Sequence, residues 1–183
     1  MEAMANLVEA GKIRSVGISN FNASQMRRAY KTLQKRGLPL AANQVRYSLL
    51  DRSIEKNGIL ATAKELDVTI IAYTPLGSGL LTGKYHKNPE LLERKSFIWR
   101  MQLRRGIEKS RSLVAALEDI AVRYKATAGQ VALNWVINSQ GDSIVTIPGV
   151  TKVSQAVESA GAMKFKLLDN EISRLDKLSQ AIN

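Results

Sequence analysis

An α/β fold with four parallel strands is the class that the sequence predicts, and three observations lead to it. Short runs rich in β-branched residues alternate with longer segments whose apolar residues repeat at helical spacing. This alternation is typical of strand–helix units and a parallel sheet rather than of hairpins. Three of the four runs also lack a strict apolar–polar alternation, as expected for strands that are covered on both faces.

The predicted strands are four short segments that follow one another along the chain. They cover residues 16–19, 43–47, 68–73 and 143–147. Four strands with their helices are half the number that closes a parallel barrel, because eight are needed. An open four-stranded sheet therefore remains possible from the strand pattern alone.

The segments between these strands carry helix start and stop signals. Asn22 followed by Gln25, and Thr127 followed by Gln130, have the spacing of a capping box. The expected helices cover residues 1–11, 22–37, 112–124, 127–141 and a last segment capped by Asp169. The buried stripe of the third of these helices is predicted to be Leu113, Val114, Leu117, Ile120 and Ala121.

Composition places the chain among globular proteins. It has 183 residues, of which 45% are hydrophobic, and this length fits a single domain over residues 1–183. The longest apolar runs fall far below the roughly 18 to 20 residues that span a bilayer, so no membrane partner is expected. The absence of cysteine excludes disulfides, thiolate metal sites and thiol nucleophiles. No metal site is expected, and a cytoplasmic location is the simplest interpretation.

The net charge of +11 raises the question of an anionic partner. Residues 84–111 hold nine Lys or Arg against three Glu, so this stretch contributes +6 of the total. Phe97 and Trp99 are too few aromatic residues for a platform that stacks bases, and no nucleic-acid motif is present. We therefore expect no nucleic-acid partner.

Four motifs, in order and at consistent spacing, resemble one known family. The run from Gly11 to Phe21, GKIRSVGISNF, is similar to the fifth strand of aldo/keto reductases. NQVRYS at 43–48 resembles strand six, IAYTPLGSG at 71–79 with LLTGKY after it resembles strand seven and its loop, and IPGVT at 147–151 resembles the end of strand eight. The resemblance implies a partial (β/α)8 TIM barrel, with residues 1–183 forming its C-terminal half.

The resemblance also implies a site for NADP(H) at the carboxyl ends of the strands, where such barrels have their active sites. Ser19, Asn20 and Gln44 would hold the carboxamide of the nicotinamide, since their side chains offer both donors and acceptors. Tyr73, followed by Thr74, would stack against the nicotinamide ring. A core aromatic is the alternative role for Tyr73.

The rest of the cofactor would lie along the next two loops. Leu76, Gly77 and Ser78 would bring backbone N–H groups to the pyrophosphate, with Lys84 as a point charge. The 2′-phosphate would be contacted by residues at the start of a helix, where free N–H groups favour an anion, and Glu158 would bond the adenine. This group comprises Gly149, Thr151 and Gln155. Arg94, in the loop after Lys84, would also contact the phosphate, although a solvated role is equally open for it. Ser159 stands where the family usually has asparagine, which puts one adenine contact in question.

The catalytic groups of the family are a tyrosine, a lysine, an aspartate and usually a histidine, and they come from the first four strands. No residue here is expected to replace them, so no catalytic residue is predicted. The single histidine, His86, is expected at the surface. The sequence thus predicts the cofactor-binding half of an NADPH-dependent reductase of aldehydes and ketones, inactive alone, whose full-length form acts on a small carbonyl compound.

Two further possibilities follow from the same residues. The chain is alternatively a non-catalytic NADP(H)-binding or regulatory module, as some relatives in the family are. Four strands would also leave two unpaired edges and a row of inward side chains in water. We therefore expect self-association, in which two copies together supply eight strands.

Overall fold

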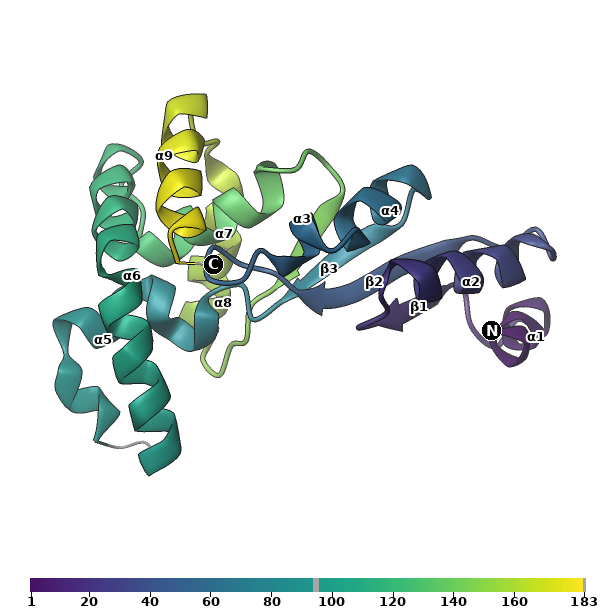
Figure 1. Ribbon diagram of the computed structural model, residues 1–183, viewed down its shortest axis with the longest axis horizontal. Coiled ribbons are helices and arrows are strands. Elements are labelled where there is room, and N and C mark those ends of the chain that lie inside the picture. The colour runs from purple at the N-terminus through teal and green to yellow at the C-terminus, as the bar shows by residue number, and fades with distance from the viewer. Residues whose placement is uncertain (94–95, 183) are drawn as a thin grey trace.

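A computed structural model describes residues 1–93 and 96–182 (Figure 1). The predicted phosphate contact Arg94 lies outside the described residues. The sheet runs through the middle of the molecule, with some helices gathered at the end that holds the N-terminus and others at the opposite end (Figure 1). Among the described residues, no helix has the length and apolar character needed to cross a membrane.

The sheet confirms the predicted parallel arrangement. It consists of β1 (Val16–Ser19), β2 (Leu40–Arg46), β3 (Thr69–Tyr73) and β4 (Ile144–Ile147), in that spatial order, and every neighbouring pair is parallel. All four predicted strands are present, but β2 begins at Leu40 rather than at residue 43. Because the strands are parallel, their carboxyl ends meet at one edge of the sheet.

The helices follow the predicted order with additions. They are α1 (Glu2–Glu9), α2 (Ala23–Gln34), α3 (Ser53–Lys56), α4 (Ile59–Glu65), α5 (Lys84–Lys87), α6 (Phe97–Arg123), α7 (Ala128–Asn138), α8 (Val153–Gly161) and α9 (Asp169–Gln180). Short 3₁₀ turns cover Gly77–Thr82, Pro89–Leu92 and Ala162–Lys164. Helices α1, α2 and α4 lie at one end of the molecule, and α5, α6 and α9 lie at the other (Figure 1).

Two of the three predicted caps are confirmed. The side chain of Asn22 accepts from the Gln25 backbone N–H at 2.9 Å, and Thr127 accepts from that of Gln130 at 3.2 Å. The prediction that Asp169 caps the last helix is wrong by one residue, because the cap position is Leu168. A leucine side chain offers no acceptor to the first N–H groups of the helix, while the backbone N–H of Leu168 donates to the carboxylate of Glu171 at 2.9 Å.

Helix α6 is longer than the sequence pattern predicted. It begins at Phe97, whereas the expected helix began at residue 112. The charged residues of this stretch are good helix formers, although they obscure the apolar repeat. Leu103 is buried and Ile107 is half-buried, and both belong to a small second core with Leu80, Tyr85 and Leu92. This tertiary contact packs the second and third turns of α6 against the rest of the chain, while Phe97, Ile98 and Trp99 of the first turn are exposed.

One face of the sheet is buried and the other is open. Val16, Ile70 and Ile144 point into the main core with the helices. The expectation that the strands are covered on both faces is therefore wrong. On the alternate positions, which we call the open face, Ile71 is half-buried and Val145 and Ile147 are 48% and 45% exposed.

A buried ion-pair network joins the segment after β2 to α9. The guanidinium of Arg52, 5% exposed, lies 2.8 Å from both Glu55 Oε2 and Asp176 Oδ1. It also lies 5.0 Å from the ring centroid of Trp135, which is fully buried. The Tyr47 hydroxyl donates to Glu55 at 2.6 Å, and burial raises the pKa of that hydroxyl. The network closes the core beneath the carboxyl ends of the strands.

Asn134 on α7 anchors the segment that follows α8. It is fully buried, and its Nδ2 donates to the carbonyl oxygens of Ala162 at 2.8 Å and Phe165 at 2.6 Å. Its Oδ1 accepts from the backbone N–H of Leu167 at 3.3 Å. One side chain thus satisfies three backbone groups. Loss of these hydrogen bonds would leave the three backbone groups buried without partners.

We expect Asn134→Ala to lower the free energy of unfolding by about 3 kcal/mol, because three backbone groups lose their hydrogen bonds. Asn138→Ala is the matched control on the same helix, since Asn138 is half-buried and donates to a single carbonyl at 3.1 Å. Urea denaturation of both variants measures the difference. Equal losses would contradict the anchoring role of Asn134.

Candidate functional site

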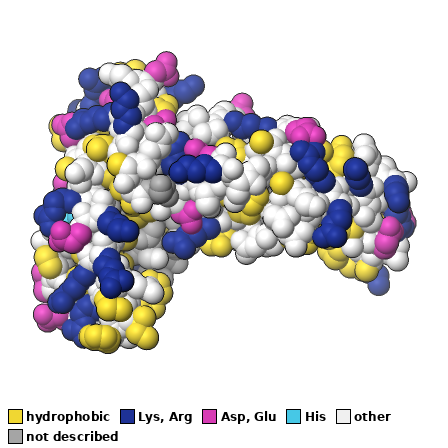
Figure 2. Space-filling view, in the orientation of Figure 1, with side chains coloured by type: hydrophobic (Ala, Val, Ile, Leu, Met, Phe, Trp, Pro, Cys, Tyr) yellow, Lys and Arg dark blue, Asp and Glu magenta, His cyan; other side chains and the backbone are white. Residues whose placement is uncertain are grey.

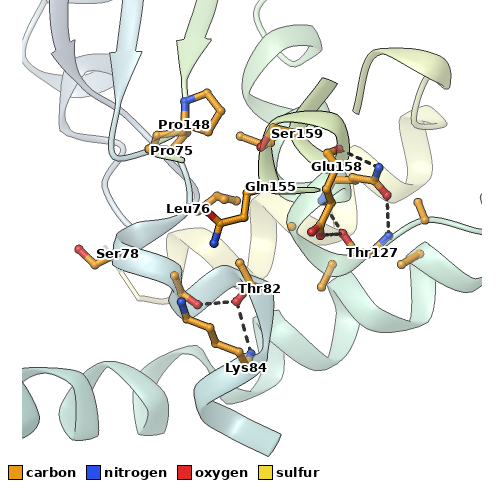
Figure 3. Close-up of a pocket in the computed structure, with 18 of the residues that line it drawn as sticks. Pro75, Leu76, Ser78, Thr82, Lys84, Thr127, Pro148, Gln155, Glu158 and Ser159 are labelled. Atoms are coloured by element: carbon orange, nitrogen blue, oxygen red, sulfur yellow. Dashed lines mark hydrogen bonds between the residues drawn. The ribbon is translucent and has the colours of Figure 1, made fainter. Parts of the chain in front are cut away.

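A cavity of about 1090 Å³ lies between the loop after β3, the end of β4 and helices α6, α7 and α8 (Figure 3). A second pocket, lined by residues of α6 and α9, measures about 220 Å³. Nine of the residues predicted from the sequence line it, namely Thr74, Leu76, Ser78, Lys84, Gly149, Thr151, Gln155, Glu158 and Ser159. The structure therefore brings together segments that are far apart in the sequence.

The remaining predicted residues of the first strands form a separate row at the carboxyl edge of the sheet. Ser19 pairs with Gln44 across β1 and β2, and the hydroxyl of Ser19 donates to the Gln44 carbonyl at 3.1 Å. The hydroxyl of Tyr73 donates to Asn20 Oδ1 at 3.2 Å, and Asn20 Nδ2 donates to Ser19 at 3.4 Å. These side chains do not line the cavity, but the row reaches it through Thr74, the residue after Tyr73.

The loop after β3 has an unusual backbone. Thr74, Gly77, Ser78 and Gly79 all have positive φ, at 54°, 55°, 57° and 88°. A Cβ on Gly79 would lie 2.8 Å from Cε of Lys84, so this lysine folds over a bare stretch of backbone. Its Nζ lies 4.8 Å from the centroid of the Tyr85 ring. The loop places a positive charge and a glycine backbone on one wall of the cavity.

Gly79 was not predicted as a site residue, although it belongs to the same loop motif. Gly77, which was predicted, does not line the cavity. Its role is to let the loop pass Leu50, because a Cβ at Gly77 would lie 2.6 Å from Leu50 Cδ1. The sequence gives the spacing of the two glycines, but only the fold decides that Gly79 and not Gly77 lines the cavity.

The start of α8 is internally capped. The side-chain oxygen of Gln155 accepts from the backbone N–H of Thr151 at 2.7 Å and from that of Lys152 at 3.2 Å. It also accepts from the Thr151 hydroxyl at 3.2 Å. Two N–H groups just before the helix, those of Thr151 and Lys152, therefore already have a partner.

Glu158 is held by two residues of α7's capping box. The Thr127 hydroxyl donates to Glu158 Oε1 at 2.7 Å, and Gln130 Nε2 donates to the Glu158 backbone carbonyl at 2.8 Å (Figure 3). Both residues line the cavity. The sequence assigned them only to the helix start, and no local signal indicated that they reach α8.

His86 is partly covered, so the expectation of a surface histidine holds only in part. It is half-buried on α5, and its Nε2 lies 3.1 Å from the hydroxyl of Ser110 on α6. Ser110 is buried and donates to the carbonyl of Gly106 at 2.7 Å. Burial is the main cause that lowers the pKa of His86 below its usual value.

Charge is mixed around the cavity. Lys84, Lys87 and Lys125 line it together with Glu118 and Glu158, and Lys87 lies 3.1 Å from Glu118. On the face shown in Figure 2, Lys and Arg side chains are scattered over both ends of the molecule rather than gathered in one patch. Within residues 1–93 and 96–182, no group of three acidic or histidine side chains is arranged to hold a metal ion.

Comparison with known proteins gives a consistent result. A family model described as "Aldo/keto reductase family" matches residues 1–180. The chain is 39% identical to aldo-keto reductase str7 of Strobilurus tenacellus over 97% of the chain and 52% of that protein. It is 36% identical to the aldo-keto reductase yakc [NADP(+)] of Schizosaccharomyces pombe, covering 96% and 51%. It is 35% identical to the chloroplastic pyridoxal reductase of Arabidopsis thaliana, covering 96% and 46%.

Solved structures agree with the sequence comparison. The crystal structure of the thermostable aldo-keto reductase Tm1743 with the inhibitor epalrestat matches with a TM-score of 0.71 at 29% identity, over 97% of this chain and 53% of that one. The chain thus spans about half the length of the relatives that it matches.

The burial of His86 predicts a stability that depends on pH. Its pKa is lower in the folded chain than the usual value of 6.5, so the unfolded chain binds the proton more readily between these two values. We expect the free energy of unfolding to fall as the pH decreases below about 6.5. Denaturation from about pH 7.5 to about pH 5.5 measures this, because no other side chain of this composition ordinarily titrates there.

His86→Asn is the control for this effect. It removes the titrating group, so the slope of unfolding free energy against pH should flatten over the same range. A slope that is unchanged in His86→Asn would show that another group is responsible.

Proposed function

Because this chain belongs to the aldo/keto reductase family, we propose that it binds NADP(H) and supplies this cofactor site to an oxidoreductase that reduces aldehydes or ketones to alcohols. The observation that carries the proposal is the continuity of two structural features. The polar row at the ends of β1 to β3 leads through Thr74 into the large cavity. Together they offer polar side chains at the strand ends, a glycine-containing loop that carries Lys84, and the carboxylate of Glu158.

The row at the strand ends suits the nicotinamide. Ser19, Asn20 and Gln44 present hydroxyl and carboxamide groups side by side, and a carboxamide ligand needs both donors and acceptors. Tyr73 is half-buried, and its hydroxyl is fixed by Asn20, which would hold its ring as a flat surface for the cofactor ring. When bound, the cofactor supplies the hydride, and these side chains bind and orient it.

The loop after β3 suits the pyrophosphate. The side chain of Lys84 lies directly over the backbone of Gly79 and is the local positive charge, so a pyrophosphate would meet this ammonium group at the loop. Leu76 and Ser78 line the same wall. At the start of α8, Thr151 and Gln155 bond to each other, so a 2′-phosphate there would have to replace the Gln155 oxygen on the backbone N–H groups.

We propose that reduction of the carbonyl requires groups that this chain does not provide. Three described side chains of suitable type have other partners. The hydroxyl of Tyr73 donates to Asn20, Lys84 lies over the ring of Tyr85, and His86 faces Ser110. None is arranged as an acid with a neighbouring lysine and carboxylate that would tune it. One relative is named a pyridoxal reductase, and pyridoxal is an aldehyde, so it is a suitable test substrate.

A non-catalytic NADP(H)-binding module is the second candidate function. The observation that favours it is that the residues brought together around the cavity include nine of those predicted to bind the cofactor. The two candidates make the same prediction for the isolated chain, namely binding without turnover. They differ for the full-length protein, which reduces an aldehyde only in the first case.

We expect the 183-residue chain to bind NADPH in calorimetric titration and to show no pyridoxal-dependent oxidation of NADPH. Lys84→Gln should weaken NADPH binding about fivefold, because it removes a charge beside the phosphates at a partly exposed site. Lys35→Gln is the matched control, since it makes the same change in an exposed lysine just after α2, at the other end of the molecule (Figure 1).

Absence of NADPH binding at millimolar concentration would overturn the proposed cofactor site. Oxidation of NADPH above a control without protein would overturn the proposed need for further catalytic groups. Equal affinity in Lys84→Gln and wild type would remove Lys84 from the site.

We also propose that the open face of the sheet promotes self-association. Val145 and Ile147 on this face are half-exposed, and β1 and β4 each have one strand neighbour in the described sheet. Apolar side chains and unpaired strand edges both favour contact with another chain, and two copies would bring eight strands together.

The double variant Val145→Lys, Ile147→Lys should shift the protein toward monomer in light scattering, because it places charges on the open face. Val157→Lys on α8, where Val157 is 68% exposed, is the matched control and should leave the oligomeric state unchanged. A wild-type chain that is monomeric at all concentrations would rule this proposal out.

A further inference from the structure

The hydroxyl of Thr127 makes two hydrogen bonds with fixed roles. It accepts from the backbone N–H of Gln130 at 3.2 Å, and it lies 2.7 Å from Glu158 Oε1. An amide N–H is always the donor and a carboxylate is always the acceptor. The single proton of the hydroxyl is therefore directed to Glu158, and this polarised arrangement connects the start of α7 to the side chain of α8.

Gln130 makes a second connection to the same residue. Its Oε1 accepts from the Thr127 backbone N–H at 2.9 Å, and its Nε2 donates to the Glu158 carbonyl at 2.8 Å. This contact needs a glycine on α8, because a Cβ at Gly161 would lie 2.2 Å from Gln130 Nε2. The capping box of α7 thus holds both the side chain and the backbone of Glu158.

The connection matters because Glu158 is an exposed residue on the wall of the cavity. A free glutamate at such a position samples several rotamers and would lose that freedom when it binds a ligand. With Oε1 bonded to Thr127, the carboxylate is fixed before a ligand arrives. Figure 3 shows this bond between the two labelled residues.

We propose that Thr127 and Gln130 are positioning residues that fix Glu158 as an acceptor for the 6-amino group of adenine, so that the cap of α7 sets the selectivity for the base. This inference rests on the proposed NADP(H) site. A pre-oriented carboxylate favours a ligand that presents N–H donors at this position and disfavours one that presents a carbonyl oxygen.

Hypoxanthine provides the discriminating probe, because it has a carbonyl oxygen where adenine has the amino group. The measured quantity is the ratio of the dissociation constants of reduced nicotinamide hypoxanthine dinucleotide phosphate and NADPH. A loss of helix capping alone would lower stability and weaken both ligands alike. The ratio therefore reports the orientation of Glu158 rather than the integrity of the helix.

We expect wild-type chain to prefer NADPH by about tenfold, as one charge-assisted hydrogen bond allows. Thr127→Val should reduce the preference to about threefold or less, and Thr127→Ser, which keeps the hydroxyl, should retain it. Glu158→Ala removes the acceptor itself, so adding Thr127→Val to it should change the ratio no further.

Gly161→Ala tests the same point without replacing Thr127 or Gln130. Alanine suits the helical φ of −60° at this position, so the fold should persist, but its Cβ displaces Gln130 from Glu158. The preference for NADPH should fall here too. Thr127→Val and Gly161→Ala variants that both keep the wild-type ratio would overturn the positioning role.

The outcomes separate this inference from the proposed function. A wild-type chain that binds neither dinucleotide overturns both. A wild-type chain that binds both with equal affinity overturns the inference while the proposed cofactor site stands.

Discussion

Parallel pairing of the four strands is the constraint on which the rest of the structure depends. It sends the chain back through a helix after each strand, and it brings the carboxyl ends of all four strands to one edge. The polar row from Ser19 to Tyr73 and the cavity beyond Thr74 lie at this edge. The same connections leave the opposite face of the sheet open, because the helices pack on the face that holds Val16, Ile70 and Ile144.

The segments that carry the site are fixed by hydrogen bonds and ion pairs of buried polar side chains as well as by apolar packing. Asn134 binds the backbone just after α8, while Arg52 joins the segment after β2 to α9 and lies against Trp135. Both residues are buried and have well-defined partners, so they specify where these segments lie. The wall of the cavity formed by α8 therefore depends on a side chain of α7 that does not itself reach the cavity.

Helix caps have two roles in this molecule. At the start of α7, Thr127 satisfies a backbone N–H and also reaches Glu158 on the next helix. Just before α8, Gln155 accepts from the N–H groups of Thr151 and Lys152, two of the donors that an anion could meet there. The side chain of a cap residue can thus orient a neighbouring group toward a ligand, or it can occupy the N–H groups that the ligand would bind. Which of the two it does depends on whether another helix lies within hydrogen-bond distance of it.

The sequence by itself determined the order of the strands, the class of fold, two of the caps and nine of the residues around the cavity, because these follow from local periodicity and from motifs in continuous segments. It did not determine the beginning of α6, the burial of His86 or the contacts of Thr127 and Gln130 with Glu158. Each of these depends on a partner that is distant in the chain: Leu80 and Tyr85 for α6, Ser110 for His86, and α8 for the cap of α7. Local sequence specifies which conformations and hydrogen-bonding groups are available, and only the packed structure decides which groups meet.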